Sequence, residues 1–260
     1  MPTAVVTGAS RGVGRGVATA LADAGYRVFA TGRGIAEADL PPTVERIVCD
    51  HLDGDQTVAV FERVKQAAGD LDVLVNCAWG GYERMVEGGA FTWAAPFWDQ
   101  PLHRWRGVID QGLRAAFVAS QAAARLMVPR RSGLIVTLSY WAARRHLGNV
   151  IYGIAQAGTD KMAADVAQEL RPYGVAAVSL YPGLVRTERV LEAAAQGVFD
   201  LASSESPQFA GRVIAALASR PHVMRQRSGE AIVAAQLAQA LGVVDVDGSQ
   251  PRALGPDDLS

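Results

Sequence analysis

The fold is decided by the stretch Thr7-Gly8-Ala9-Ser10-Arg11-Gly12-Val13-Gly14. An apolar run at residues 3–6 comes before it, and apolar residues at helical spacing begin at Val17. This pattern predicts a buried strand that ends in a glycine-rich turn and opens a helix. Glycines spaced G-x-x-x-G-x-G let the backbone turn tightly, so a pyrophosphate can approach bare N–H groups at the positive end of the helix. A purely structural turn is the alternative, but the strand–turn–helix context favours a dinucleotide site.

Length and composition indicate a single domain, residues 1–260. Half of the residues are hydrophobic and 20% are charged, so the chain can build one large core. The net charge is −1 without a dense Lys/Arg cluster, which argues against nucleic-acid binding. No apolar run approaches the ~18 residues of a membrane span, and the N-terminus lacks a signal-peptide pattern. We expect a cytoplasmic protein without a metal site, because Cys49 and Cys77 form neither a disulfide framework nor a ligand spacing.

Strands and helices alternate along the chain, which predicts a doubly wound parallel α/β sheet, the Rossmann fold. Buried strands are expected at residues 3–6, 27–31, 46–49, 72–75, 134–138, 175–180 and 230–233. Helices are expected from residue 17 and at 57–68, 105–127, 149–173, 188–195 and 208–218. Residues 129–133 are expected to break the helix at 105–127. Residues 34–45 contain two prolines and predict a loop in place of a crossover helix. The chain from Asp245 onward reads as a polar tail.

The end of the second strand favours NADP(H) over NAD(H). NAD-binding units place an acidic residue there to bond the ribose 2′-hydroxyl, but this chain has Gly32 followed by Arg33. Arg11 lies in the glycine turn. Two guanidiniums with no competing carboxylate suit a 2′-phosphate. The alternative is that either arginine is only solvated.

Two further features leave alternatives open. Asp50 follows the third strand, where its carboxylate could meet an adenine amino group or could cap the loop. Residues 79–105 contain seven aromatic side chains, interrupted by glycines and Pro96. Such a segment could line the site of a bulky apolar substrate or could pack into the core.

Ser139 and Tyr152 carry the expected chemistry. Ser139 follows the fifth strand and Tyr152 begins the next helix, so both belong near the carboxyl edge of the sheet. A serine hydroxyl can polarise a carbonyl while a tyrosine hydroxyl supplies a proton. Together with the glycine turn, this pair resembles the short-chain dehydrogenase/reductase family, whose members reduce carbonyls or oxidise alcohols with a nicotinamide cofactor.

The resemblance covers nearly the whole chain and implies roles for single residues. It assigns the cofactor turn to Gly8, Ser10, Arg11, Gly12, Val13 and Gly14. Asp50 matches the family's adenine-contacting carboxylate, and Asn76-Cys77-Ala78 is similar to an altered N-N-A-G motif. Pro182, Gly183, Val185 and Thr187 match the nicotinamide-side segment, and Thr187 would also face the diphosphate. Residues 134–152 and Asp245-Val-Asp-Gly are most similar to the subgroup named dehydrogenase/reductase member one.

Two departures from the family pattern concern catalysis. The motif Y-x-x-x-K reads Tyr152-Gly153-Ile154-Ala155-Gln156, so Gln156 stands in the Lys position. Gln156 faces the same way as Tyr152 and can donate a hydrogen bond, but it supplies no cation. Lys161 lies on the opposite side of the helix, ~13 Å along it. Gly112 takes the place of the family's helix asparagine.

The missing ammonium favours reduction over oxidation. A nearby cation lowers an ionisable group's pKa by ~1–3 units, and an unperturbed tyrosine titrates near 10. Without it, Tyr152 should stay protonated at neutral pH and act as the acid that carbonyl reduction needs. Arg144, Arg145 or Arg186 could supply a substitute charge.

The sequence thus predicts an NADP(H)-dependent carbonyl or imine reductase, with Ser139 polarising and Tyr152 protonating the substrate. The replacements at Gln156 and Gly112 leave two alternatives: a redox-impaired nucleotide-binding sensor or assembly protein, and a dehydratase or isomerase on the same fold. The resemblance also implies a homodimer or homotetramer that pairs through the helices at 105–127 and 149–173. An apolar helix face could equally pack inward.

Overall fold

A seven-stranded parallel sheet forms the centre of the computed structural model, which describes residues 1–80 and 85–258. The strand order is β3-β2-β1-β4-β7-β8-β9. The strands are β1 (Thr3–Thr7), β2 (Arg27–Gly32), β3 (Glu45–Val48), β4 (Val73–Asn76), β7 (Gly133–Leu138), β8 (Val175–Tyr181) and β9 (Ala231–Val233). The predicted doubly wound fold is confirmed. The order reverses between β1 and β4, the place where ligands bind in such sheets.

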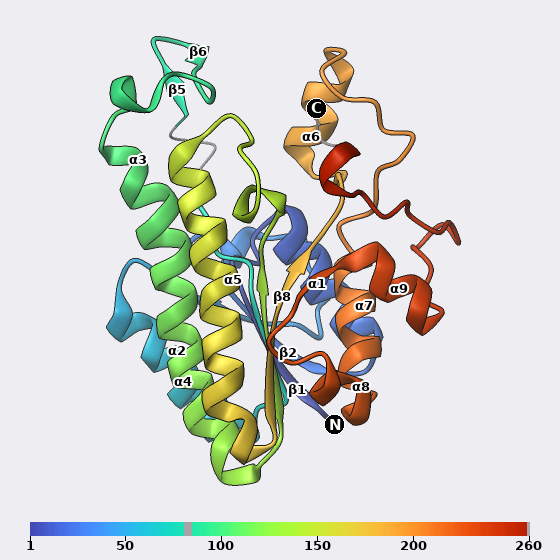
Figure 1. Ribbon diagram of the computed structural model, residues 1–260. Helices are drawn as coiled ribbons and strands as arrows, with labels where there is room; N and C mark the ends of the chain where they lie inside the picture. The colour runs from blue at the N-terminus through green and yellow to red at the C-terminus, as the bar shows by residue number, and fades with distance from the viewer. Residues whose placement is uncertain (81–84, 259–260) are drawn as a thin grey trace.

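Helices cover both faces of this sheet (Figure 1). One core lies under α2 (Gly54–Ala68), α4 (Ala115–Arg130) and α5 (Val150–Leu170), and the other under α1 (Gly12–Asp23), α7 (Phe209–Ala218) and α9 (Ala234–Leu241). Side chains alternate between them, because successive strand residues point to opposite faces. Val5 packs into the first core and Val6 into the second, which is why the strands read as continuous apolar runs.

The connections show where local chemistry sets the helix ends. The loop predicted between β2 and β3 is confirmed; it contains only η1 (Ile35–Glu37). Helix α2 begins before the predicted residue 57, because the Asp53 carboxylate accepts the N–H groups of Asp55 and Gln56. The helix break expected at residues 129–133 is confirmed. Helix α4 includes Pro129, ends at Arg130 and is followed by the C-cap Arg131, which has φ +56°. Proline removes only one hydrogen bond in this last turn.

The helix pair α4 and α5 runs the height of the molecule (Figure 1). A π-helical segment, η4 (Arg106–Arg114), precedes α4, so the predicted helix at 105–127 is wider in its first half. Asn149 is not the first residue of α5 but its N-cap, and its Oδ1 accepts the Tyr152 N–H at 2.9 Å. The predicted helix at 149–173 ends as a short 3₁₀ turn, η6 (Arg171–Tyr173).

Short elements surround the carboxyl edge of the sheet. The segment after β4 contains β5 (Val86–Glu87), β6 (Ala90–Phe91), η3 (Phe97–Asp99) and α3 (His103–Trp105). On the other side stand η5 (Trp141–Ala143) and α6 (Glu188–Ala195). In Figure 1 the β5–β6 hairpin and α6 project beyond the sheet at the same end. Helix α8 (Pro221–Gln226) and helix α9 were not expected from the sequence.

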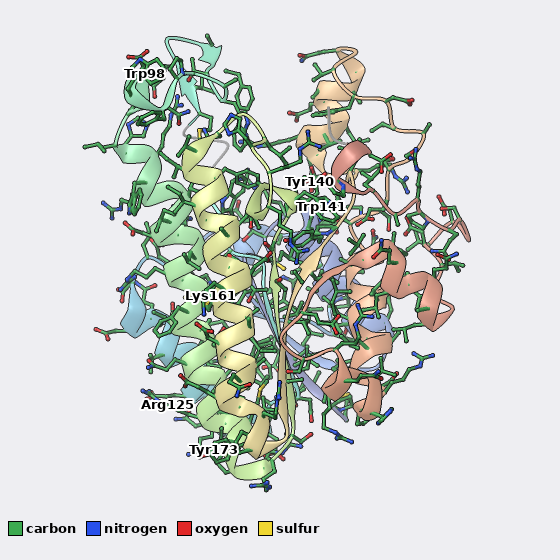
Figure 2. The ribbon with its side chains drawn as sticks, viewed as in Figure 1. Trp98, Arg125, Tyr140, Trp141, Lys161 and Tyr173 are labelled. Carbon is green, nitrogen blue, oxygen red and sulfur yellow. The ribbon has the colours of Figure 1, made fainter. Side chains whose placement is uncertain are left out.

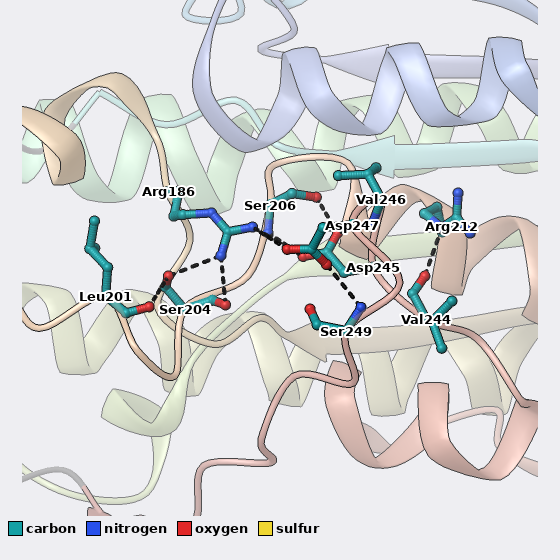
Figure 3. Close-up of polar contacts among 10 residues, drawn as sticks. All are labelled: Arg186, Leu201, Ser204, Ser206, Arg212, Val244, Asp245, Val246, Asp247 and Ser249. Carbon is teal, nitrogen blue, oxygen red and sulfur yellow. Dashed lines mark hydrogen bonds and ion pairs between the residues drawn. The ribbon is translucent and has the colours of Figure 1, made fainter.

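The C-terminal segment is irregular and largely exposed, as expected, but one residue anchors it. Asp245 is 1% exposed, and its carboxylate accepts the Ser206 N–H at 2.7 Å (Figure 3). The segment ends with η7 (Pro256–Asp258). Within residues 1–80 and 85–258, none of the helices combines the length and the apolar character that crossing a bilayer requires.

Candidate functional site

The glycine turn leaves no room for larger residues at two of its positions. Gly8 has φ +66°, and a Cβ there would lie 2.5 Å from the Ala78 Cα. A Cβ on Gly14 would lie 2.3 Å from the Gly8 carbonyl oxygen. The Thr7 hydroxyl accepts the N–H groups of Cys77 and Ala78 at 3.2 Å each, which closes the turn onto the end of β4. These contacts fit a backbone cradle for a diphosphate at the start of α1.

A carboxylate already uses one N–H group of this cradle. Gly12, with φ +55°, donates its N–H to Glu188 Oε2 at 3.1 Å. The same carboxylate pairs with Arg15 at 2.7 Å. Thr187 is the N-cap of α6 and approaches Gly12 at the same place. The start of α6 therefore packs on the turn, which the sequence pattern did not indicate.

The end of β2 lies beside the turn. The Ala9 N–H donates to the Thr31 carbonyl at 2.9 Å, and a Cβ on Gly32 would lie 2.4 Å from the Ser10 Oγ. Arg33 and Arg11 are exposed, whereas Ser10 and Val13 are partly buried. A larger residue at position 32 would displace Ser10. The 2′-phosphate contacts of Arg11 and Arg33 stay a prediction.

Asp50 and His51 follow β3 with different roles. The Asp50 carboxylate accepts the Leu52 N–H at 3.1 Å, so the loop-capping alternative is present; the adenine contact stays a prediction. His51 is 5% exposed and its Nε2 lies 2.8 Å from the Thr31 hydroxyl. Burial lowers the pKa of His51 to about 4, partly opposed by Asp50. A neutral His51 therefore supports β2 just before Gly32.

Asn76, predicted to contact the cofactor, lies at the end of β4. Its Nδ2 donates to the Ser120 hydroxyl at 3.0 Å and to the Thr137 hydroxyl at 3.1 Å. Asn76 is 3% exposed, so its side chain links β4 to α4 and β7. This structural contact neither requires nor excludes a role toward the cofactor.

The structure brings Ser139 to the helical turn that carries Tyr152. The Ser139 hydroxyl donates to the backbone carbonyl of Gln156 at 3.3 Å, and the Ser139 N–H donates to the backbone carbonyl of Leu180 at 2.9 Å. Ser139 is 4% exposed, while Tyr152 and Gln156 are partly buried. Gln156 is one turn beyond Tyr152 on the same face of α5. The phenol and the amide therefore share one face of α5, and the Ser139 hydroxyl approaches that helix from the end of β7.

Cations close in sequence have other partners. The Lys161 side chain is 74% exposed and pairs with Asp165 at 2.6 Å, on the outer face of α5 (Figure 2). Arg145 donates to the Pro256 carbonyl, and Arg186 reaches Ser204 and Asp245. Arg144 lies over the Trp141 ring, 6.0 Å from its centroid. We assign none of them to Tyr152.

Asp160, one turn beyond Gln156, is a residue that sequence reasoning missed. Its carboxylate accepts the Ser179 hydroxyl at 2.7 Å and also the Tyr181 hydroxyl. Tyr181 is 1% exposed, and burial, with the neighbouring Asp160, raises the pKa of its phenol. The spacing Tyr152, Gln156, Asp160 could have revealed that Asp160 faces β8. Asp160 thereby fixes α5 to β8, the strand that ends at Tyr181 just before Pro182.

The segment from Pro182 to Thr187 is held by Glu205. Val185 forms an isolated parallel bridge with Glu205, whose N–H donates to Leu184 at 2.9 Å. The Glu205 side chain is buried against Gly183, where an added Cβ would lie 3.0 Å from Oε2. Burial raises the Glu205 pKa to about 7, and Asp245 adds to the rise.

Arg186, labelled in the left half of Figure 3, extends this support to the C-terminal segment. Its Nη1 donates to the Ser204 carbonyl at 2.9 Å, and its Nη2 lies 3.5 Å from Asp245 Oδ2. The nicotinamide-side segment expected from the sequence is therefore braced by residues that lie far along the chain.

Comparison with known proteins agrees with this geometry. The family model described as short chain dehydrogenase matches residues 2–196. Dehydrogenase/reductase SDR family member 1 of Mus musculus is 39% identical over 264 residues, covering 94% of this chain and 83% of that protein. The protein of the same name from Homo sapiens is 38% identical with the same coverage. The crystal structure of YwfH, an NADPH-dependent reductase involved in bacilysin biosynthesis, superposes with a TM-score of 0.72 at 20% identity, covering 89% of this chain and 96% of that one.

The similarity to YwfH supports the fold alone, because its sequence identity is low. The family match and the two mammalian relatives extend over most of the chain. The protein belongs to the short-chain dehydrogenase/reductase family of oxidoreductases.

Proposed function

We propose that the protein is an NADP(H)-dependent reductase of carbonyl compounds. The observation that carries this proposal is the contact between Ser139 and the Gln156 carbonyl on the helical turn after Tyr152, at the same edge of the sheet as the glycine turn. The glycine cradle fits a diphosphate, and Gly32 with Arg33 fits a ribose 2′-phosphate. Bound there, the cofactor supplies the hydride.

The chain's own residues bind and protonate the substrate. The Ser139 hydroxyl hydrogen-bonds the substrate oxygen and polarises the carbonyl. The Tyr152 phenol donates its proton to that oxygen as the oxygen gains charge. Gln156 places an uncharged amide where family members have an ammonium, and in this proposal the Tyr152 phenol serves as the acid. In this proposal Val185 and Thr187 orient the nicotinamide ring.

NADPH oxidation with a panel of aldehydes and ketones tests the assignment. We expect turnover with NADPH, and at least a ~100-fold lower kcat in Tyr152→Phe with unchanged NADPH affinity. Arg33→Ala should lower the preference for NADPH over NADH about tenfold, since it removes a charge-assisted hydrogen bond. Arg63→Ala, an exposed arginine on α2, is the matched control. Tight NADPH binding without turnover of any compound on the panel would instead support the nucleotide sensor. This alternative is suggested by the replacements at Gln156 and Gly112.

We propose in addition that a second copy of the chain covers α4 and α5. Phe117 on α4 is 51% exposed and Ile154 on α5 is 45% exposed, and Tyr173, in the turn η6 that follows α5, is 43% exposed. A groove of about 430 Å³ runs between them, lined in part by Phe117, Arg125 and Glu169. Analytical ultracentrifugation should give a dimer or tetramer, and Phe117→Glu should shift it toward the monomer. The cytoplasmic location stays a prediction.

A further inference from the structure

Four aromatic rings form a connected series that reaches Tyr152. Phe91 stacks on Trp93 with ring centroids 6.3 Å apart and an interplanar angle of 12°. Trp93 meets the Tyr152 ring edge-on at 5.1 Å, and Trp79 meets it at 5.8 Å with a 57° tilt. Phe91 is 62% exposed, whereas the other three rings are partly buried. This ring series therefore extends from the surface to the proposed proton donor.

The polar groups around Trp93 fix its position relative to Tyr152. The Trp93 Nε1–H donates to the Leu147 carbonyl at 3.0 Å. Asn149 Nδ2 donates to the Trp93 carbonyl at 2.9 Å, while Asn149 Oδ1 accepts the Tyr152 N–H at 2.9 Å. Asn149 is only 2% exposed. One buried side chain thus caps α5 and holds Trp93 to the turn that carries Tyr152.

Apolar side chains support the same indole. Trp93 packs against a small cluster of Met85, Val108 and Ala155, with Ile151 beside it. Met85 and Val108 are 0% exposed. This backing limits the freedom of Trp93, so a ligand would meet a ring that is already in place.

Gly112 gives Trp79 its place in the series. A Cβ on Gly112 would lie 3.0 Å from Trp79 Cδ1, tighter than ordinary van der Waals contact. Gly112 lies in the π-helical segment η4, where the sequence comparison placed the family's asparagine. A side chain at position 112 and the Trp79 indole compete for one space. Glycine at position 112 therefore leaves the space that the Trp79 indole takes beside Tyr152.

We propose that the ring series is the recognition surface for the organic part of the substrate, and that the protein prefers carbonyl groups attached to flat aromatic ring systems. The inference rests on the proposed function, because it takes Tyr152 as the group that meets the carbonyl oxygen. A flat ring placed against Trp93 makes offset or edge contacts with the indole that a saturated ring of equal size does not make. Each such contact is expected to favour the aromatic ligand about 2- to 10-fold.

Two ligand pairs test this in complementary ways. The turnover pair is 2-naphthaldehyde and its decahydro analogue, compared as a ratio of kcat/KM with NADPH. The binding pair is the two corresponding alcohols, titrated calorimetrically with NADPH present, so that no redox turnover occurs. The two aldehydes differ in intrinsic reactivity, but this difference is the same for every variant. For turnover we therefore compare the ratio of kcat/KM in each variant with the ratio in the wild type. The variants are Trp93→Leu and Trp93→Phe, with Trp98→Leu as the matched control. Trp98 is 73% exposed and contacts Phe97 at 5.4 Å (labelled in Figure 2).

We expect Trp93→Leu to reduce the aromatic preference about 5- to 10-fold in both ratios, and Trp93→Phe and Trp98→Leu to retain most of it. An unchanged ratio in a folded Trp93→Leu variant, or a wild-type protein that binds both alcohols equally, overturns the inference. Aromatic preference in calorimetry without turnover of any carbonyl supports the inference on recognition and rejects the proposed reductase activity.

Discussion

The glycine turn and the catalytic turn of α5 hold their chemistry in different ways. The turn at residues 7–14 acts through backbone N–H groups and through the absence of side chains at Gly8 and Gly14. In the proposed catalytic site the groups are side chains: Tyr152 and Gln156 lie on the regular helix α5, and Ser139, which follows β7, contacts the backbone of that helix. A change in the first region alters the backbone, whereas a change in the second leaves the helix intact.

This difference explains where the chain departs from its family. The glycine pattern is complete, because an added Cβ at Gly8 or Gly14 would meet backbone atoms. The departures expected at Gln156 and Gly112 fall on helical positions, where they leave the course of the backbone unchanged. We therefore expect cofactor binding to be retained in this protein and the chemistry at Tyr152 to differ from the family pattern.

Gly14→Ala should have the largest effect. Alanine is a better helix former than glycine, and Gly14 lies in the first turn of α1. A Cβ at this position would nevertheless lie 2.3 Å from the Gly8 carbonyl oxygen. We expect the turn to open and NADPH affinity, measured by fluorescence titration, to fall more than about 100-fold. Gly34→Ala is the matched control, since nothing lies within 4 Å and its φ is −99°. Near-wild-type affinity in Gly14→Ala would show that the turn is not the cofactor cradle.

Glu205→Gln should change how stability depends on pH. The Glu205 pKa is raised by burial to about 7, so the folded protein holds this proton above the ordinary range of a carboxyl. The stability contributed by the neutral acid is present below about pH 4.5 and is lost as pH rises through about 7. Each tenfold difference in proton affinity between the folded and unfolded chains is worth about 1.4 kcal/mol.

Urea unfolding at pH values from about 4.5 to 8 measures this dependence. We expect the wild type to lose up to about 3 kcal/mol relative to Glu205→Gln across that range. Protonation of buried His51 has the opposite effect: it lowers the stability of the folded protein as pH falls from about 6.5 toward about 4. This effect should be the same in both proteins. Parallel stability curves for the two proteins would contradict the burial of an ionising Glu205.

Gln156→Lys should sharpen the contrast between the two directions of reaction. An ammonium one turn beyond Tyr152 is expected to lower the phenol pKa by ~1–3 units. Alcohol oxidation with NADP⁺ at pH 7 should then rise about tenfold or more, because oxidation needs the base form. Carbonyl reduction at the same pH should change less. Gln156→Met, which adds no charge, is the control, and an equal oxidation rate in all three proteins would exclude the role given to the missing cation.

Glu188→Gln should give the smallest change and should affect binding alone. Its carboxylate accepts the Gly12 N–H at 3.1 Å and pairs with Arg15 at 2.7 Å. A diphosphate in the proposed cradle competes with it for these groups. Removing the charge should strengthen NADPH binding about 2- to 5-fold. Glu192→Gln, exposed on the same helix, is the matched control. Weaker binding would mean that Glu188 holds α6 in the position the cofactor needs.

The sequence predicts well those features that local chemistry determines. The glycines at residues 7–14 predict a tight turn, and apolar runs between turns predict the strands. Asp53, whose side chain caps the start of α2, is also a local signal, because aspartate is a preferred N-cap residue. Helix α4 continues through Pro129 because a proline in the last turn costs a single hydrogen bond.

Contacts between distant segments could not be read from any local pattern. Glu188 reaches Gly12 across 176 positions, and Trp79 occupies the space that Gly112 leaves. The sequence predicts that Asp245 begins a polar tail, but in the structure Asp245 is 1% exposed and accepts the Ser206 N–H. Such contacts arise from tertiary packing, which brings together residues whose own neighbours in sequence carry no signal.

The pH dependence of NADPH-driven carbonyl reduction tests the central claim most directly. The claim is that a neutral Tyr152 phenol, without a cation at position 156, gives its proton to the substrate. We expect kcat for the wild type to stay level from pH 6 to about 9 and to fall as a phenol with a pKa near 10 ionises, and we expect Tyr152→Phe to lose this activity at every pH. A rate that falls with an apparent pKa between about 6 and 8, or full activity in Tyr152→Phe, would contradict the account.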